Sequence, residues 1–127
     1  MFAAAVRRKL RARHFLIGDF GPESIPHSHP YLVEAVCRNP GLDSHGFSTD
    51  IALLEEHLEK VLEAIDDVLL NDLDFFCRQQ PSLENLCVYI QKDLTDRLKQ
   101  AGAHLPEQIE IKIWESDDAW ASYTHPV

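Results

Sequence analysis

The sequence lacks a cysteine motif, because its three cysteines follow no recognisable pattern. Their number is odd and no two are spaced as Cys-x-x-Cys, so the sequence indicates neither a disulfide framework nor a sulfur-ligated zinc site. We therefore expect Cys37, Cys77 and Cys87 to be buried thiols.

Long apolar runs are also missing. No stretch approaches the roughly 18 consecutive apolar residues of a membrane helix, and the apolar segment MFAAAV is too short for a secretory signal and lacks a cleavage-site pattern. The chain has no low-complexity tract and no internal repeat, and its 127 residues suffice for one domain. We expect a single domain over residues 1–127, in the cytoplasm and without a membrane partner.

Basic residues are outnumbered: the sequence has 12 lysines and arginines against 21 aspartates and glutamates, a formal net charge of −9. This charge argues against a general nucleic-acid binder, whose affinity comes from neutralising phosphates. Five of the twelve basic residues nevertheless lie between Arg7 and Arg13, and four of them share the odd parity of one strand face. Two interpretations stay open: a solvated strand face, or a pocket for a phosphorylated ligand.

Hydrophobic periodicity predicts four strands and two helices. Residues 5–17 and 30–38 are predicted as strands, residues 108–114 alternate perfectly (QIEIKIW), and a short strand is expected near residues 120–123. Residues 49–68 carry apolar side chains at helical spacing. A second helix is predicted from the N-cap Ser82 to Gly102.

Strands and helices grouped in blocks, in the order ββααββ, indicate the α+β class. We predict a four-stranded antiparallel sheet with both helices on one face. Such a sheet keeps a bare face and open edges, which favours assembly into an oligomer.

Three histidines form a candidate metal site. His27 and His29 are two residues apart in an extended segment, so their imidazoles point the same way. His14, on the apolar face of the preceding strand, would approach them if the two strands pair. Three imidazoles and an open position are typical of catalytic zinc. His57 lies among charged helix residues, and we expect it to be solvated.

Taken in order, these residues resemble the motifs of the 6-pyruvoyltetrahydropterin synthase and 6-carboxytetrahydropterin synthase family. That family has a histidine in its first strand, then Cys-x-x-x-His-Gly-His, a Gly and an Asp before the first helix, Asp-His followed by Leu-Asn, Pro-Thr-x-Glu-Asn, and a Glu after the third strand. The corresponding residues here are His14, Glu23 to His29 (ESIPHSH), Gly46, Asp50, Asp66 to Asn71 (DDVLLN), Pro81 to Asn85 (PSLEN) and Glu115.

The resemblance implies the tunnelling fold, in which sheets from several subunits join into a barrel, typically a hexamer built as a dimer of trimers. It implies zinc held by His14, His27 and His29, and a pterin substrate such as 7,8-dihydroneopterin triphosphate. It also implies that Glu115 anchors the pterin ring, with Ser82 and Glu84 of the PSLEN motif as further substrate-binding residues.

Three positions depart from the family pattern. Glu23 replaces the cysteine, Asp67 replaces the histidine, and Ser28 replaces the glycine of His-Gly-His, so Asp66 alone remains of the usual acid/base set. A branch of the family is similar in having glutamate at the cysteine position, and there the resemblance implies carbon–carbon cleavage of the side chain to 6-hydroxymethyl-7,8-dihydropterin, a folate precursor. Glu23 would then be the base and Asp66 a supporting or proton-relay group.

Two alternatives stay open. One is a lyase of the biopterin or queuosine pathway that tolerates these changes, with 6-pyruvoyl- or 6-carboxytetrahydropterin synthase activity. The other is a catalytically silent protein that binds zinc and pterin.

Overall fold

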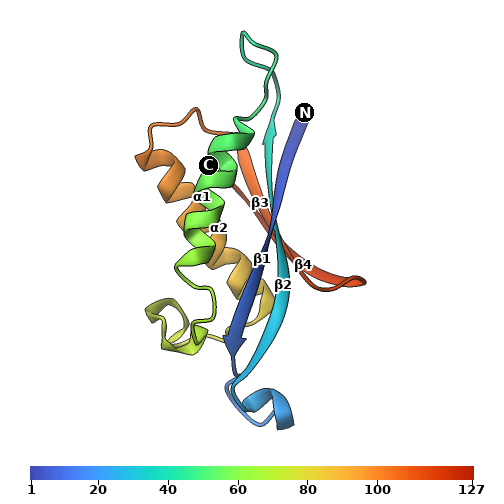
Figure 1. Cartoon of the computed structure of the whole chain (residues 1–127), viewed down its shortest axis with the longest axis vertical. Coiled ribbons are helices and arrows are strands. Elements are labelled where there is room, and N and C mark those ends of the chain that lie inside the picture. The colour runs from blue at the N-terminus through green and yellow to red at the C-terminus, as the bar shows by residue number, and fades with distance from the viewer.

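The chain folds into two layers, a twisted antiparallel sheet and a pair of helices that cover one of its faces (Figure 1). This computed structural model describes all 127 residues. The elements in chain order are β1 (Phe2–His14), the 3-10 helix η1 (Gly21–Ser24), β2 (His27–Asn39), α1 (Ile51–Glu63), the 3-10 helices η2 (Leu70–Asp72) and η3 (Asp74–Phe76), α2 (Leu83–Gln100), β3 (Gln108–Ser116) and β4 (Ala119–Pro126). The predicted ββααββ order and the α+β class are confirmed.

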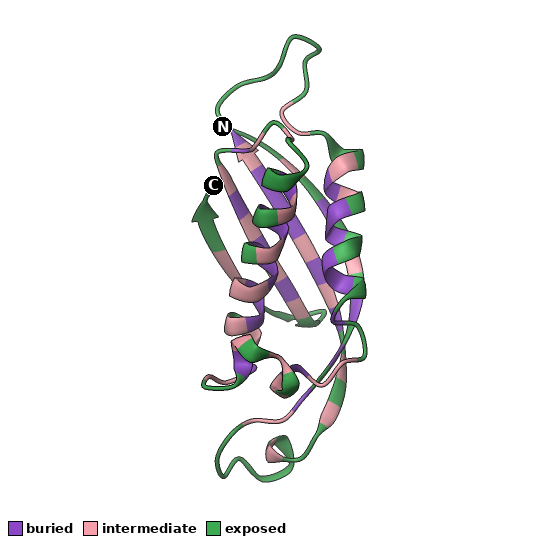
Figure 2. Cartoon of the chain, turned by 90° about the vertical axis from the view of Figure 1, so that its left-hand side faces the viewer, coloured by how far each residue is buried: buried purple, intermediate pink, exposed green.

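The sheet has the order β1-β2-β3-β4, with every neighbouring pair antiparallel. Side chains of a strand alternate between its two faces, and the helices cover the face that carries the apolar side chains. Ile109, Ile111 and Ile113 are fully buried there, as their alternation predicts. Figure 2 shows buried positions alternating with less buried ones along the strands that lie behind the helices.

Most strand ends differ from the sequence-based prediction by one to three residues, and two of these differences have a clear structural cause. β1 ends at His14 instead of residue 17, because the backbone of Phe15 and Ile17 bonds to side-chain amides and not to β2. β2 begins at His27, ahead of Pro30, although proline normally interrupts a central strand. The proline is tolerated because β3 pairs with β2 only from Leu32 onward, so β2 has a single neighbour at this point.

Both helices begin at the capping residues that the sequence supplies. The Asp50 side chain accepts from the backbone N–H of Leu53, and the Ser82 side chain accepts from that of Asn85. The first helix ends at Glu63, earlier than its apolar period suggests. The chain leaves the helix because Asp67, at a left-handed φ of 57°, donates its N–H to the Arg11 carbonyl of β1.

Two predictions about single residues are wrong. His57 is buried, not solvated, because it lies between Leu54 and Val61 on the buried stripe of α1, at the same helical spacing. Cys77 is exposed at the end of η3, whereas Cys37 and Cys87 are buried as expected.

The outer edges of the sheet are largely open. The segment after α1 covers one end of β1, through Asp66, Asp67 and a short parallel bridge between Arg13 and Leu69. The rest of the β1 edge and the whole β4 edge have no strand partner within the chain. None of the helices has the length and apolar character needed to cross a bilayer.

Candidate functional site

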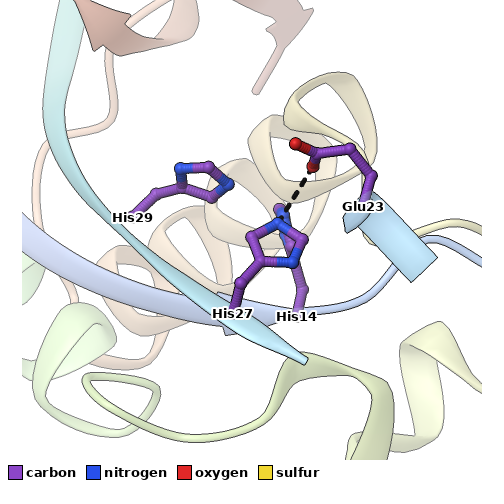
Figure 3. Close-up of side chains that lie close together, drawn as sticks. All are labelled: His14, Glu23, His27 and His29. Carbon is purple, nitrogen blue, oxygen red and sulfur yellow. Dashed lines mark ion pairs between the residues drawn. The ribbon is translucent and has the colours of Figure 1, made fainter. Parts of the chain in front are cut away.

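The three histidines predicted to bind metal meet at one end of the sheet. His14 is the last residue of β1 and pairs directly with His27, the first residue of β2, while His29 lies one step further along the same face. Their ring centroids are 4.7 to 5.1 Å apart, with the rings edge to face. Antiparallel pairing therefore brings together imidazoles that are far apart in the sequence (Figure 3).

Burial keeps the first of these imidazoles neutral. His14 is 5% exposed, and desolvation, with the nearby His27 and His29, lowers its pKa from 6.5 to about 4. A histidine binds a metal ion through a neutral ring nitrogen, so this environment favours the ligating form.

Glu23 completes the cluster from outside the sheet. It belongs to η1, in the loop between β1 and β2, and its Oε2 lies 3.0 Å from Nε2 of His27. Figure 3 shows its carboxylate turned toward the imidazoles. Potential ligand atoms of His14, Glu23, His27 and His29 all lie within 4.8 Å of one another.

The donor atoms of this cluster fit a cation. Nδ1 of His27 donates to the Ile25 carbonyl at 2.6 Å, so the ring turns its Nε2 toward the Glu23 carboxylate. A proton or a metal ion between Nε2 and Oε2 makes this 3.0 Å contact favourable. Nδ1 of His14 and Nε2 of His27 are buried without a hydrogen-bond partner, an arrangement that is costly in a protein without a ligand. The geometry thus suits a metal with nitrogen and oxygen ligands.

Tyr31 extends the cluster toward β3, although no sequence pattern singles it out as a site residue. Its ring stacks on His29 with centroids 5.4 Å apart and an interplanar angle of 6°. Burial raises the pKa of the Tyr31 phenol well above its ordinary value, and the charges of Glu115 and Glu23 add to this effect. Tyr31 is therefore a neutral phenol next to the metal cluster.

Glu115 lies on the helix-covered face, beyond Tyr31 from the histidines. It shares the parity of Ile113 and occupies a register irregularity between Trp114 and Ser116. A β-bulge of this kind can re-aim a side chain at the rim of a sheet. Glu115 is exposed and outside the group of four potential ligands, and its predicted role in pterin binding stays a prediction.

Asp66 is not part of the cluster within a single chain. Its Oδ1 accepts from the backbone N–H of Arg11 at 2.8 Å, on the outer edge of β1. Arg11 is three residues from His14 along the strand, roughly 10 Å at the usual rise. Asp66 therefore faces the open edge of the sheet, and its predicted role in catalysis stays a prediction.

Ser82 and Glu84 lie at the beginning of α2, close to the histidines. The carbonyl of the preceding residue, Pro81, interacts with the His14 ring. The Ser82 hydroxyl caps the helix, and Glu84 is exposed. The structure thus gives Ser82 a structural role, and substrate binding by either residue stays a prediction.

Four of the five basic residues of β1 lie on the face opposite this cluster, and the fifth, Arg8, pairs with Glu55 and Glu59 of α1. Arg7, Lys9, Arg11 and Arg13 have the opposite parity to His14, so they lie on the helix-free face, where all four are exposed. Arg7 pairs there with Glu34 at 2.6 Å. The single chain exposes these four residues, and phosphate binding by them stays a prediction.

The sequence analysis also missed the residues that hold the loop around Glu23. Asn71 and Gln80 each bond through their side-chain amides to the backbone that follows His14. Asn71 ends the DDVLLN motif, but nothing in the sequence indicates its partner, which is 56 residues away.

Comparisons with known proteins agree with this architecture. The family profile described as 6-pyruvoyl tetrahydropterin synthase matches residues 4–126. The 6-pyruvoyl tetrahydrobiopterin synthase of Drosophila melanogaster is 33% identical over 103 residues, which cover 79% of this chain and 58% of that protein. This chain therefore matches little more than half the length of the fly relative.

Solved structures share the fold at lower sequence identity. The 6-pyruvoyl tetrahydropterin synthase of Plasmodium vivax superimposes with a TM-score of 0.77 at 16% identity, over 100% of both chains. The Caenorhabditis elegans enzyme gives a TM-score of 0.77 at 21% identity, over 98% of this chain and 97% of the other. With the profile match across nearly the whole sequence, the chain belongs to the 6-pyruvoyl tetrahydropterin synthase family.

Proposed function

We propose that this protein is a zinc-dependent lyase that cleaves the side chain of 7,8-dihydroneopterin triphosphate and releases 6-hydroxymethyl-7,8-dihydropterin, a folate precursor. The observation that carries the proposal is the position of Glu23. A carboxylate takes the place of the family's cysteine, and its Oε2 is 3.0 Å from a histidine of the metal cluster.

Zinc would be held by His14, His27 and His29. The donor set of imidazoles, the unpartnered ring nitrogens and the neutral state of His14 support this assignment. When bound, zinc supplies Lewis acidity that favours ionisation of the substrate's side-chain hydroxyls.

Glu23 is the general base of the proposed reaction. It takes the proton of the 2′ hydroxyl, the bond between C1′ and C2′ breaks, and C2′ becomes the aldehyde carbon of a two-carbon fragment that keeps the triphosphate. The electron pair left on C1′ is delocalised into the unsaturated pterin ring until C1′ is protonated. A carboxylate that is half exposed and has no strong hydrogen bond of its own is suited to this proton transfer.

Similar proteins support a glutamate in this role. Two Plasmodium vivax structures of the same fold are of variants in which a glutamate, described as a catalytic residue, was replaced by alanine or by cysteine. Glu115 would bind the 2-amino group and ring N–H of the pterin through its two carboxylate oxygens, because it faces the cluster side of the sheet beyond Tyr31.

The open edges of β1 and β4 support assembly into a hexamer, a dimer of trimers. Pairing β4 of one copy with β1 of another would continue the sheet into a barrel and remove both edges. Asp66 lies on the β1 edge, so in such an assembly it would be close to a neighbouring subunit, where it could relay a proton in a shared site.

A second candidate is 6-pyruvoyltetrahydropterin synthase activity, because the Drosophila melanogaster relative carries that name. The two reactions release different products from one substrate. Purified protein loaded with zinc would be incubated with 7,8-dihydroneopterin triphosphate, and the products identified by mass spectrometry. Release of 6-hydroxymethyl-7,8-dihydropterin supports the proposal, whereas a 6-pyruvoyl product with free triphosphate supports the second candidate. Bound pterin without any product identifies a silent binder.

A further inference from the structure

The loop of residues 15–26 carries Glu23 but has no strand partner. It is closed on itself by internal hydrogen bonds: the Leu16 N–H donates to the Glu23 carbonyl at 2.7 Å, and the Ser24 hydroxyl donates to the Gly18 carbonyl at 2.7 Å. These bonds give the loop a shape. Nδ1 of His27 donates to the Ile25 carbonyl at 2.6 Å and ties the end of the loop to the metal cluster, but none of these bonds holds the beginning of the loop.

Two side-chain amides hold the beginning of the loop. Asn71 donates to the Phe15 carbonyl and accepts from the Phe15 N–H, both at 3.0 Å. Gln80 does the same with Ile17, both at 2.7 Å. Each amide has one donor group and one acceptor. It therefore makes the two hydrogen bonds that a residue of a neighbouring strand would otherwise make.

The two amides come from the segment between the helices, which is itself anchored. Asn71 lies in η2, next to the buried Leu70. The Gln80 carbonyl accepts from the side chain of Asn85, in the first turn of α2, at 2.9 Å. Figure 1 shows this segment beside the loop at the lower end of the molecule.

Leu16 connects the amides to the base. It lies between the two bonded residues, Phe15 and Ile17, so its N–H has a fixed position, and this N–H holds the backbone of Glu23. A path of short hydrogen bonds therefore leads from α2, through Asn85, Gln80 and the loop, to the residue whose carboxylate lies 3.0 Å from His27.

We propose that Gln80 and Asn71 are positioning residues that aim Glu23 at the metal cluster. The inference rests on the proposed function, since it assumes that Glu23 is the base. Gln80 is the more informative of the two, because Asn71 bonds next to the ligand His14 and its loss would also disturb the metal site.

The test compares Gln80→Leu with Gln79→Leu. Gln79 is a matched control, because it is also partly buried and its side chain also bonds to a backbone carbonyl, that of Phe75 at 2.6 Å, but it does not contact the loop. We expect Gln80→Leu to lower kcat for 7,8-dihydroneopterin triphosphate about 10- to 100-fold, with KM and zinc content unchanged, because small displacements of a catalytic group have effects of this size. Gln79→Leu should keep the parent kcat. Gln80→Glu keeps the acceptor for the Ile17 N–H, so its kcat should lie between those of Gln80→Leu and Gln79→Leu.

A double variant shows whether Gln80 acts through Glu23. In the Glu23→Gln background the base is absent, so Gln80→Leu should cause no further loss of kcat. If the two losses multiply, or if Gln80→Leu alone keeps the parent kcat, the positioning role is wrong. A parent rate in Glu23→Gln alone would instead refute the proposed base.

Hydrogen exchange gives a second result that does not depend on turnover. Backbone amides of residues 16 and 17 should exchange faster in Gln80→Leu than in the parent and in Gln79→Leu. If the parent converts no substrate, the proposed function fails, and the exchange result decides alone. Equal exchange in all three proteins would overturn the inference.

Discussion

Glu23 differs from Asp19, the other acidic residue of the 15–26 loop, because it contacts the histidine cluster. If it is the general base, Glu23→Gln keeps the shape of the side chain but cannot accept a proton. Turnover should then fall by roughly 10² to 10⁴, with zinc per chain unchanged. Single-turnover product formation measures this, with Asp19→Asn in the same loop as control. Parent turnover with a full zinc complement would show that Glu23 is not the base.

His14 makes the stability of the metal-free protein depend on pH. Its folded-state pKa is about 4 and its ordinary value 6.5, so between these pH values the unfolded chain binds a proton that the folded chain does not. The free energy of unfolding should therefore fall as the pH decreases from 6.5 toward 4, by at most about 1.4 kcal/mol per pH unit.

Urea unfolding in the presence of a chelator, at several pH values, measures this dependence. His14→Gln should flatten it over the same range, whereas His45→Gln, an exposed histidine outside the cluster, should not. An identical slope in His14→Gln and parent would assign the effect to other groups.

At the scale of single elements, substitutions of Ser82 at the beginning of α2 can distinguish a capping role from a role in substrate binding. Ser82→Ala should lower the free energy of unfolding by about 1 kcal/mol, because the Asn85 N–H loses its cap. Ser82→Asp should restore the cap. If Ser82 also contacts substrate, Ser82→Asp would raise KM without loss of stability, and an unchanged KM would leave it a capping role alone.

The buried histidine of α1 is a second element-scale case. His57 is 8% exposed, and its Nδ1 has no hydrogen-bond partner. Since an unpaired buried polar atom costs about 1 to 3 kcal/mol, His57→Leu should raise the free energy of unfolding by about 1 kcal/mol. Chemical denaturation tests this. A less stable variant would mean that the ring has a polar partner, such as a bound water.

The same elements show which features the sequence predicts. Alternation over Ile109 to Ile113 and helical spacing from Ile51 onward identify β3 and α1, because one face of each is buried. The His-x-His spacing predicts a shared direction for two imidazoles, and strand pairing adds the third. The strand and the helix are predictable because their patterns are local in the sequence. The histidine site is predictable because it needs only the pairing of two neighbouring strands.

Features made by contacts between distant segments were not predictable in this way. The end of α1 depends on Asp67 bonding to β1, and the end of β1 depends on Asn71 and Gln80. Tyr31 and His57 look ordinary in sequence, and only the packing around them reveals a stacked phenol and a buried imidazole.

At the scale of the whole molecule, the open edges of the sheet predict self-association. Sedimentation at low protein concentration should give a particle of about six times the 14.5 kDa chain mass, because barrel closure removes the β1 and β4 edges. A 14.5 kDa species that still binds pterin would contradict a site shared between subunits. Replacing a residue in the middle of β4, such as Thr124→Pro, should weaken assembly, since proline removes a ladder donor.

The register of His14 opposite His27 has a consequence for how such a protein can evolve. Both residues belong to the strand ladder, while Glu23 belongs to the loop that joins the strands. The ladder would keep its geometry if this loop were exchanged for another of different sequence or length. A different catalytic residue could then be introduced by exchanging this loop while the metal ligands of the strands stay in place. The simplest laboratory version of that step is to graft a loop that carries cysteine between the two strands.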